Sequence, residues 1–146
     1  MAMQRKWMAI VGALVLGALA QSAPAKKAGV AVLTPAADVK WNDVPGFAGV
    51  QMAAVQGDPA KGAHHSLLKF TAGFSAPMHH HTADHFVTVI SGTVTLTVDG
   101  KETKLPAGSY FSFTGGKPHA TACDAGADCV LFLDARAKWD VVPEKK

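Results

Sequence analysis

The amino-acid sequence predicts an all-β fold, a small barrel or sandwich. Short runs rich in β-branched, aromatic and aliphatic residues recur along the chain, and turn residues separate them. No segment after residue 20 shows the spacing of apolar residues that an amphipathic helix needs. The runs expected to form strands are 51–56, 66–71, 86–91, 93–98, 109–113 and 129–134.

The first twenty residues precede this pattern and are typical of a removable export signal. Arg5 and Lys6 supply the positive start, an apolar run covers 7–20, and Ala-Leu-Ala at 18–20 offers a cleavage site for signal peptidase. The run is shorter than the ~20 apolar residues that cross a bilayer, so we expect no stable membrane anchor in the mature form. The sequence therefore predicts a periplasmic or secreted protein.

The remaining chain is expected to be one domain behind a short tether. Residues 21–31 are rich in Ala and Lys and lack a periodic pattern, so we assign them to a flexible tether and assign 32–146 to the folded domain. Loss of Arg5 and Lys6 would leave twelve basic and eleven acidic side chains, a net charge of about +1. No basic stripe suited to nucleic acid and no charge block suited to a membrane surface is present.

The clearest turn within the domain is Asp99-Gly100, a strong signal for a two-residue hairpin. It joins the expected strand 93–98 to residues 101–105. In the first strand Val94, Leu96 and Val98 alternate with threonines, which predicts one face towards the core and one towards water.

The domain contains two cysteines, Cys123 and Cys129. In an exported protein such a nearby pair favours a disulfide over a redox catalyst, although two free thiols on adjacent strands fit the sequence as well. The five residues between them, 124–128, are expected to form the tip of a hairpin, which would place the two sulfurs opposite each other.

Histidines form the most informative pattern of the chain. In extended backbone, His79 and His81 point to one face while His80 points to the other. The short segment 82–84 can redirect the chain so that His85 returns towards them. A second cluster holds His119 behind two glycines and a proline, at the expected start of a strand. Imidazoles that converge in this way can bind a transition metal.

The first histidine cluster resembles the first motif of the cupin superfamily. That motif runs Gly, five residues, His-x-His, three or four residues, Glu, six residues, Gly. The matching positions here are Gly73, His79, His81, His85 and Gly92. Every spacing fits, and the one departure is a histidine at position 85 where the family usually has Glu.

The second cluster resembles the second cupin motif, which runs Gly, five residues, Pro-x-Gly, two residues, His, three residues, Asn. The matching positions are Gly108, Thr114, Gly116, His119 and Cys123. Thr114 replaces Pro and Cys123 replaces Asn, but the metal-binding histidine is present. The resemblance covers about residues 64–135 and implies a cupin barrel, the jelly roll also called a double-stranded β-helix.

The resemblance implies a metal site made of His79, His81, His85 and His119. We expect one divalent transition metal ion, Mn, Fe, Zn, Cu or Ni. All-imidazole ligation suits the last four, whereas some four-histidine cupins are manganese proteins. With four neutral imidazoles the ion keeps its charge of +2, one unit more than with a carboxylate ligand, and it attracts anionic ligands more strongly. The change at His85 also removes a carboxylate that some cupins use as a base.

Three functions fit this predicted site. The first is a metal-dependent oxygenase that acts on a small organic substrate. The second is a non-catalytic module that binds or senses a metal or small ligand outside the cytoplasm. The third, a metal-independent sugar-binding or isomerase cupin, fits the intact histidine set least. The sequence names no catalytic residue, and the resemblance implies a possible homodimer.

Other conspicuous side chains are expected to have structural roles. His80 should point away from the site, and His64 and His65 should lie at the exposed start of the strand 66–71. Trp41 and Trp139, near opposite ends of the domain, are expected to close the edges of the barrel.

Overall fold

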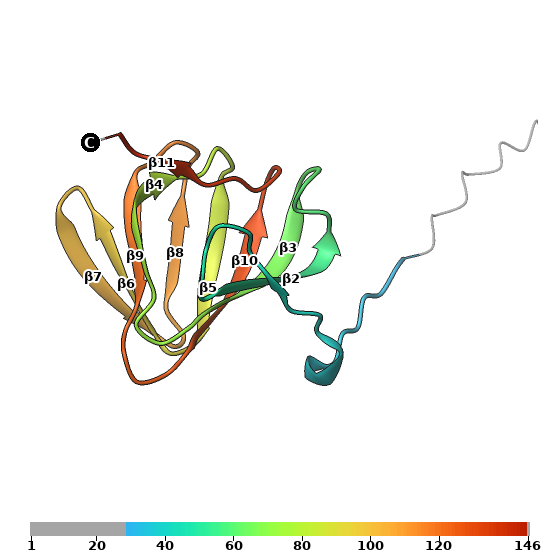
Figure 1. Cartoon of the computed structure of the whole chain (residues 1–146). Coiled ribbons are helices and arrows are strands. Elements are labelled where there is room, and N and C mark those ends of the chain that lie inside the picture. The colour runs from blue at the N-terminus through green and yellow to red at the C-terminus, as the bar shows by residue number, and fades with distance from the viewer. Residues whose placement is uncertain (1–28, 146) are drawn as a thin grey trace, which may run out of the picture. The chain divides into compact units, whose positions relative to one another are not determined.

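Two antiparallel sheets pack against each other in the computed structural model, which describes residues 29–145 (Figure 1). Sheet A has the order β1 (Asn42–Asp43), β2 (Val50–Gly57), β3 (His64–Phe70), β10 (Cys129–Ala135), β5 (His85–Ser91) and β8 (Tyr110–Phe113). Sheet B has the order β11 (Val142–Pro143), β4 (Ser75–His80), β9 (His119–Cys123), β6 (Thr93–Val98) and β7 (Lys101–Pro106).

The all-β prediction is confirmed. Each of the six predicted segments is a strand whose ends differ from the prediction by at most two residues. Among residues 29–145 the one helical element is a 3₁₀ turn at Ala36–Asp38, and no helix there is long and apolar enough to cross a membrane. The expected export signal 1–20 and most of the expected tether 21–31 lie outside the described residues.

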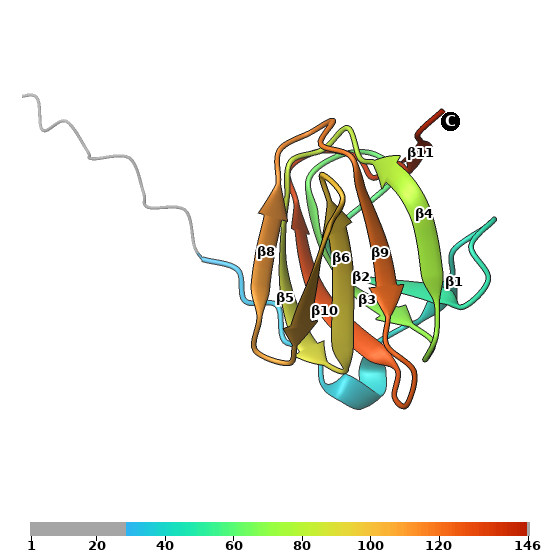
Figure 2. The ribbon, with the colours of Figure 1, turned by 90° about the vertical axis from the view of Figure 1, so that its left-hand side faces the viewer.

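The barrel interior is built from alternate residues of the facing strands. Val94 and Leu96 of β6 are buried as their alternation predicts, whereas Val98 at the end of the strand is only half-buried. Val94 and Leu96 belong to the same core as Leu131 and Leu133 of β10. The turned view in Figure 2 shows β6 and β9 in front of strands of the other sheet. Apolar burial between the two layers is therefore the main force that closes the barrel.

The hairpin between β6 and β7 forms as predicted. Asp99 and Gly100 both have positive φ angles, 50° and 76°. Two successive residues in this region make a type I′ turn, whose twist matches that of the flanking strands. The strands pair from Thr93 opposite Pro106 to Val98 opposite Lys101.

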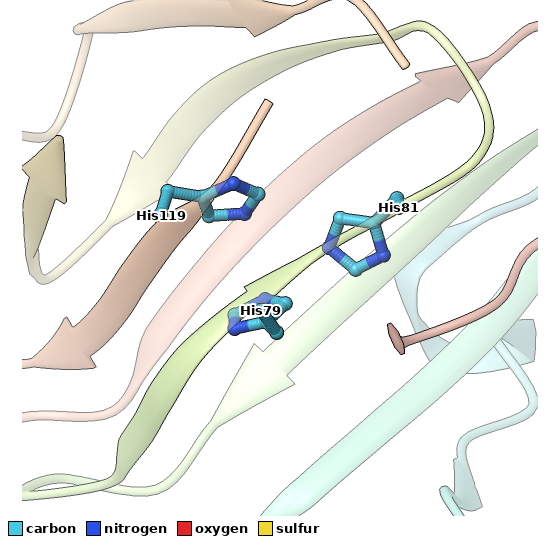
Figure 3. Close-up of side chains that lie close together, drawn as sticks. All are labelled: His79, His81 and His119. Carbon is cyan, nitrogen blue, oxygen red and sulfur yellow. The ribbon is translucent and has the colours of Figure 1, made fainter. Parts of the chain in front are cut away.

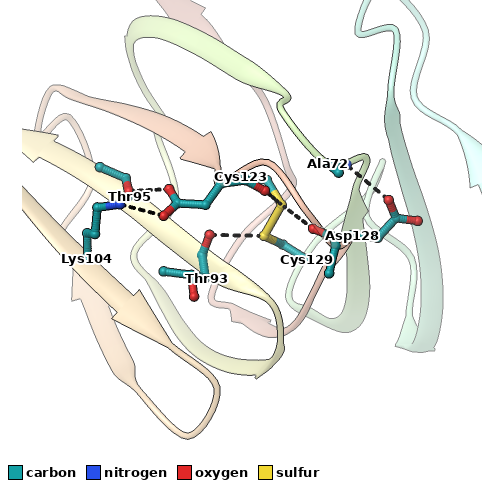
Figure 4. The surroundings of a disulfide bond; sticks show 9 residues. Ala72, Thr93, Thr95, Lys104, Cys123, Asp128 and Cys129 are labelled. Carbon is teal, nitrogen blue, oxygen red and sulfur yellow. Dashed lines mark hydrogen bonds and ion pairs between the residues drawn. A yellow bond between two sulfur atoms is a disulfide. The ribbon is translucent and has the colours of Figure 1, made fainter.

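Cys123 and Cys129 form a disulfide, but the expected hairpin around them is wrong (Figure 4). Cys123 ends β9 in sheet B, whereas Cys129 begins β10 in sheet A, and these two strands do not pair with each other. β9 pairs instead with β4 and β6, and β10 pairs with β3 and β5. The bond therefore joins the two sheets, and both cysteines are buried.

Candidate metal centre

Three of the four predicted histidines come from sheet B and its edge. His79 on β4 and His119 on β9 lie directly opposite each other across the strand pair. His81 follows immediately after β4, and strand alternation turns it to the same side as His79. Figure 3 shows the three rings pointing towards one another. One possible ligand atom from each lies within 4.8 Å of those of the other two, close enough to bind one metal ion.

His85 reaches this group from the opposite sheet, as the first residue of β5. Its ring centroid is 4.9 Å from that of His81 and 5.9 Å from that of His119. The structure therefore brings all four predicted histidines to one place, but it groups three of them at ligand distance and sets His85 beside them.

Each of these imidazoles is held by a hydrogen bond from its Nδ1 to a main-chain carbonyl oxygen. His79 bonds to Pro77 at 2.7 Å, His85 to Ala83 at 3.1 Å, and His119 to Lys117 at 3.0 Å. The Nδ1 of His81 bonds to the carbonyl oxygen of Asp140 in the same way. A carbonyl oxygen only accepts, so Nδ1 carries the proton and Nε2 keeps its lone pair free for a metal.

Burial favours the neutral form, which metals bind, for His81, His85 and His119. The loss of hydration lowers the pKa of His81 to about 3 and that of His119 to about 4. Desolvation likewise lowers the pKa of His85, against a smaller opposing effect of its hydrogen bond to Ala83. Neutral imidazoles with a free Nε2, gathered in one buried site, are the donor set that a divalent transition metal needs.

The histidines line one end of a cavity of about 80 Å³ between the sheets. This volume holds several water molecules or a small organic molecule of a few atoms. Among the described residues that line it, the four histidines are the ionisable ones, and Thr121 and Trp139 add a hydroxyl and an indole. The remaining lining residues are Val44, Phe47, Val50, Met52, Leu68, Phe70, Phe74, Ala76, Val87, Phe111, Leu131, Leu133 and Val141.

Two aromatic side chains stack on the histidine rings and limit their orientation. Phe113 stacks on His119 with the ring planes 4° apart and the centroids 4.2 Å apart. Trp139 stacks on His81 at 3.9 Å and meets His85 edge to face at 5.2 Å. The prediction that Trp139 closes a barrel edge missed this contact, because residues 139 and 81 are far apart in the chain and only the fold brings them together.

Of the predictions for histidines outside the site, the one for His80 is confirmed and the one for His64 is wrong. His80 points away from the cluster as predicted and pairs with Glu144. His64 is not exposed as predicted, since only 3% of its surface is accessible. β3 begins two residues earlier than expected, and its alternation turns His64 inwards, edge to face with Trp139. Its Nδ1 bonds to the carbonyl oxygen of Gly62 at 3.0 Å.

Comparison with known proteins agrees with this architecture. Residues 66–135 match the model of the Cupin domain. The polyketide cyclase RemF from Streptomyces resistomycificus superposes with a TM-score of 0.69 at 20% identity, over 80% of this chain and 87% of that one. An RmlC-like cupin protein from Ralstonia eutropha JMP134 gives a TM-score of 0.63 at 24% identity, over 78% and 73% of the two chains.

A third solved structure has another activity in its name. The DMSP lyase DddQ from Ruegeria pomeroyi DSS-3 gives a TM-score of 0.61 at 18% identity, over 75% of this chain and 64% of that one. A search of curated proteins found no match. At these identities the structural likenesses bear on the fold, and not on the reaction. Residues 66–135 are thus similar to the Cupin domain and the fold is similar to that of solved cupins, and three histidines of this chain lie close enough together to bind a metal ion.

Proposed function

We propose that this protein binds one divalent transition metal ion through His79, His81, His119 and His85, and that it is a metal-dependent oxygenase of a small organic substrate. The observation that carries the metal site is the shared orientation of the four imidazoles. Each donates Nδ1–H to a main-chain carbonyl and keeps Nε2 for the ion. The ion would supply Lewis acidity and an open position for a substrate oxygen.

The chain itself contributes binding and exclusion of water rather than acid–base catalysis. Among the described lining residues, the ionisable groups are the four histidines that would hold the metal, so no carboxylate or amine is left as a separate base. The apolar walls favour an apolar substrate body, and the uncompensated charge of the ion favours an anionic oxygen at its reacting end. A chelating enolate or carboxylate of small size has both properties.

The same lack of a separate base supports a second candidate, a non-catalytic module that binds a metal or a small ligand. Oxygen uptake by the metal-loaded protein separates the two, with diketones, flavonols and catechols as the substrate panel. Uptake that depends on the metal supports the oxygenase. A protein that holds metal but consumes no oxygen with any of them supports the binding module.

Metal affinity of single alanine variants tests the metal site itself. We expect His79→Ala, His81→Ala and His119→Ala each to lower the affinity for Co²⁺ or Zn²⁺ by more than the ~10–100-fold typical of losing a supporting residue. The matched control is His65→Ala, which removes an imidazole that bonds to Gln56 away from the cluster and should keep the affinity within about threefold. Calorimetric titration of the metal-free protein gives the values. Unchanged affinity in all three variants would refute the site.

His85 has its own test, because the structure sets it beside the other three rings. If the ion has four histidine ligands, we expect His85→Ala to lower the metal affinity as the other alanine variants do. We then expect His85→Glu to retain the metal with altered reactivity. If His85→Ala binds the metal as tightly as the unmodified protein does, the site has three histidine ligands.

We further propose that the protein is exported to the periplasm or beyond. The disulfide between Cys123 and Cys129 supports this, because such bonds persist in oxidising compartments. We expect mass spectrometry of the protein from an expressing bacterium to show a chain that begins after residue 20. A full-length chain recovered from the cytoplasm would contradict the proposal.

A further inference from the structure

The segment after β10 forms one wall of the metal centre, although it lies outside both histidine motifs and outside the matched residues 66–135. We call residues 139–144 the C-terminal strap. It leaves sheet A after β10 and joins sheet B through β11, which pairs with β4 (Figure 2). Its Trp139 and Val141 line the cavity. The strap therefore crosses between the two sheets beside the histidines.

The strap holds His81 in two ways. Trp139 stacks on the imidazole face with a centroid distance of 3.9 Å and an angle of 21° between the planes. The carbonyl oxygen of Asp140 accepts the Nδ1–H of His81. The other three histidines donate this hydrogen bond to a carbonyl oxygen two residues earlier in their own segment. His81 alone among the four depends on a distant segment for both its tilt and its tautomer.

Further bonds hold the strap against the β4 segment. The carboxylate of Asp140 accepts hydrogen bonds from the backbone N of Thr82 at 2.8 Å and from its Oγ1 at 2.6 Å. Val142 and Pro143 pair with His80 and His79. At the far end the backbone N of Glu144 donates to the carbonyl oxygen of Met78 at 3.0 Å, and its carboxylate pairs with His80.

We propose that the C-terminal strap is part of the metal centre, with Trp139 and Asp140 as positioning residues that orient His81, and that a bound metal in turn holds the strap in place. The inference rests on the proposed metal binding. The coupling is reciprocal because the strap and the metal both select the same orientation of the His81 ring, so each stabilises the state that the other needs.

Tryptophan fluorescence provides a direct test, since Trp139 lies against a proposed ligand. The chain has three tryptophans, so replacement of Trp7 and Trp41 by phenylalanine leaves Trp139 as the one emitter. We expect stoichiometric Co²⁺ to quench more than about half of its emission. The matched control replaces Trp7 and Trp139 and keeps Trp41, which lies against Lys69 and should be quenched far less. Equal quenching of the two proteins would overturn the inference.

Affinity and spectra of variants test the positioning role. Trp139→Ala and Asp140→Ala should each weaken Co²⁺ binding by about 10–100-fold, the range seen for residues that orient ligands. They should also shift the visible absorption of the bound Co²⁺, which a purely structural role would leave unchanged. Trp139→Phe keeps an aromatic face and should restore both properties. If the unmodified protein binds Co²⁺ and both alanine variants match it in affinity and spectrum, the strap inference fails while the proposed metal site stands. If the unmodified protein binds no Co²⁺, the metal site itself fails.

Limited trypsin digestion tests the reciprocal effect on the unmodified protein, without any variant that could fail to fold. Lys138 is exposed immediately before the strap, and Lys101 is exposed on β7 at the opposite edge of sheet B. We expect Co²⁺ to slow cleavage after Lys138 at least about fivefold relative to cleavage after Lys101. The same relative rates with and without Co²⁺ would show that the metal does not hold the strap.

Discussion

Substitution of Gly115 by alanine is expected to destabilise the protein by about 3 kcal/mol, the upper part of the range for inserting an atom into a packed site. A Cβ on Gly115 would lie 2.2 Å from the carbonyl oxygen of Thr82, a main-chain atom that cannot rotate away. The two loops in contact here adjoin the proposed metal ligands. Gly115 N donates to Asp84 Oδ1 at 2.7 Å, and Gly116 N donates to the carbonyl oxygen of His81 at 2.9 Å. The clash should therefore weaken metal binding as well.

Urea unfolding and Co²⁺ titration of the Gly115→Ala protein measure both effects. Gly116→Ala is the matched control in the same loop. A Cβ on Gly116 would meet no atom within 4 Å. The cost of this substitution is the left-handed backbone conformation, φ 82°, which is unfavourable for alanine by about 1 kcal/mol. Equal losses of stability in the two variants would show that the contact between the loops contributes nothing.

The free energy of unfolding of the metal-free protein is expected to fall with pH already at pH values well above the range in which carboxylates titrate. In the folded state burial lowers the pKa of His81 to about 3 and that of His119 to about 4, whereas an unfolded histidine titrates near pH ~6.5. Between these values the unfolded chain binds more protons than the folded one, so the free energy of unfolding falls as the pH falls. Each buried histidine contributes up to about 1.4 kcal/mol per pH unit inside its window.

Chemical denaturation of the metal-free protein at several pH values between about 7 and 5 measures this slope. His119→Gln should reduce it, because one buried titrating group is lost while a polar side chain of similar reach remains. A free energy of unfolding that does not change across this range would mean that the imidazoles are hydrated or protonated in the folded protein.

The all-β class, six of the strands and one hairpin could be predicted from local patterns. Alternation in 93–98 placed Val94 and Leu96 in the core, and Asp99-Gly100 predicted the turn that joins β6 to β7. These predictions succeed because strand alternation and turn preference depend on neighbouring residues. The candidate site was predictable for a different reason. The spacing of its histidines resembles a known motif, and the same alternation separates His79 and His81 from His80.

What the sequence could not supply was the pairing of distant segments. The disulfide between Cys123 and Cys129 was a sound expectation, but only the topology shows that it joins two sheets rather than two strands of a hairpin. His64 was misplaced because the start of β3 was set two residues late, which left His64 in an exposed lead-in; once it belongs to the strand, it shares the buried face of Ser66 and Leu68.

At the four histidines, some features follow from the sequence and others only from the tertiary structure. The sequence by itself determined the residue types and the alternation that turns His79 and His81 to one side, whereas the pairing of β4 with β9 brings His119 to ligand distance of them. The tertiary structure alone decided which groups surround them. Sheet A brings His85 alongside, and the C-terminal strap brings Trp139 and Asp140 onto His81. The contacts of the strap with His81 join residues about sixty positions apart, and no local preference of the chain encodes them.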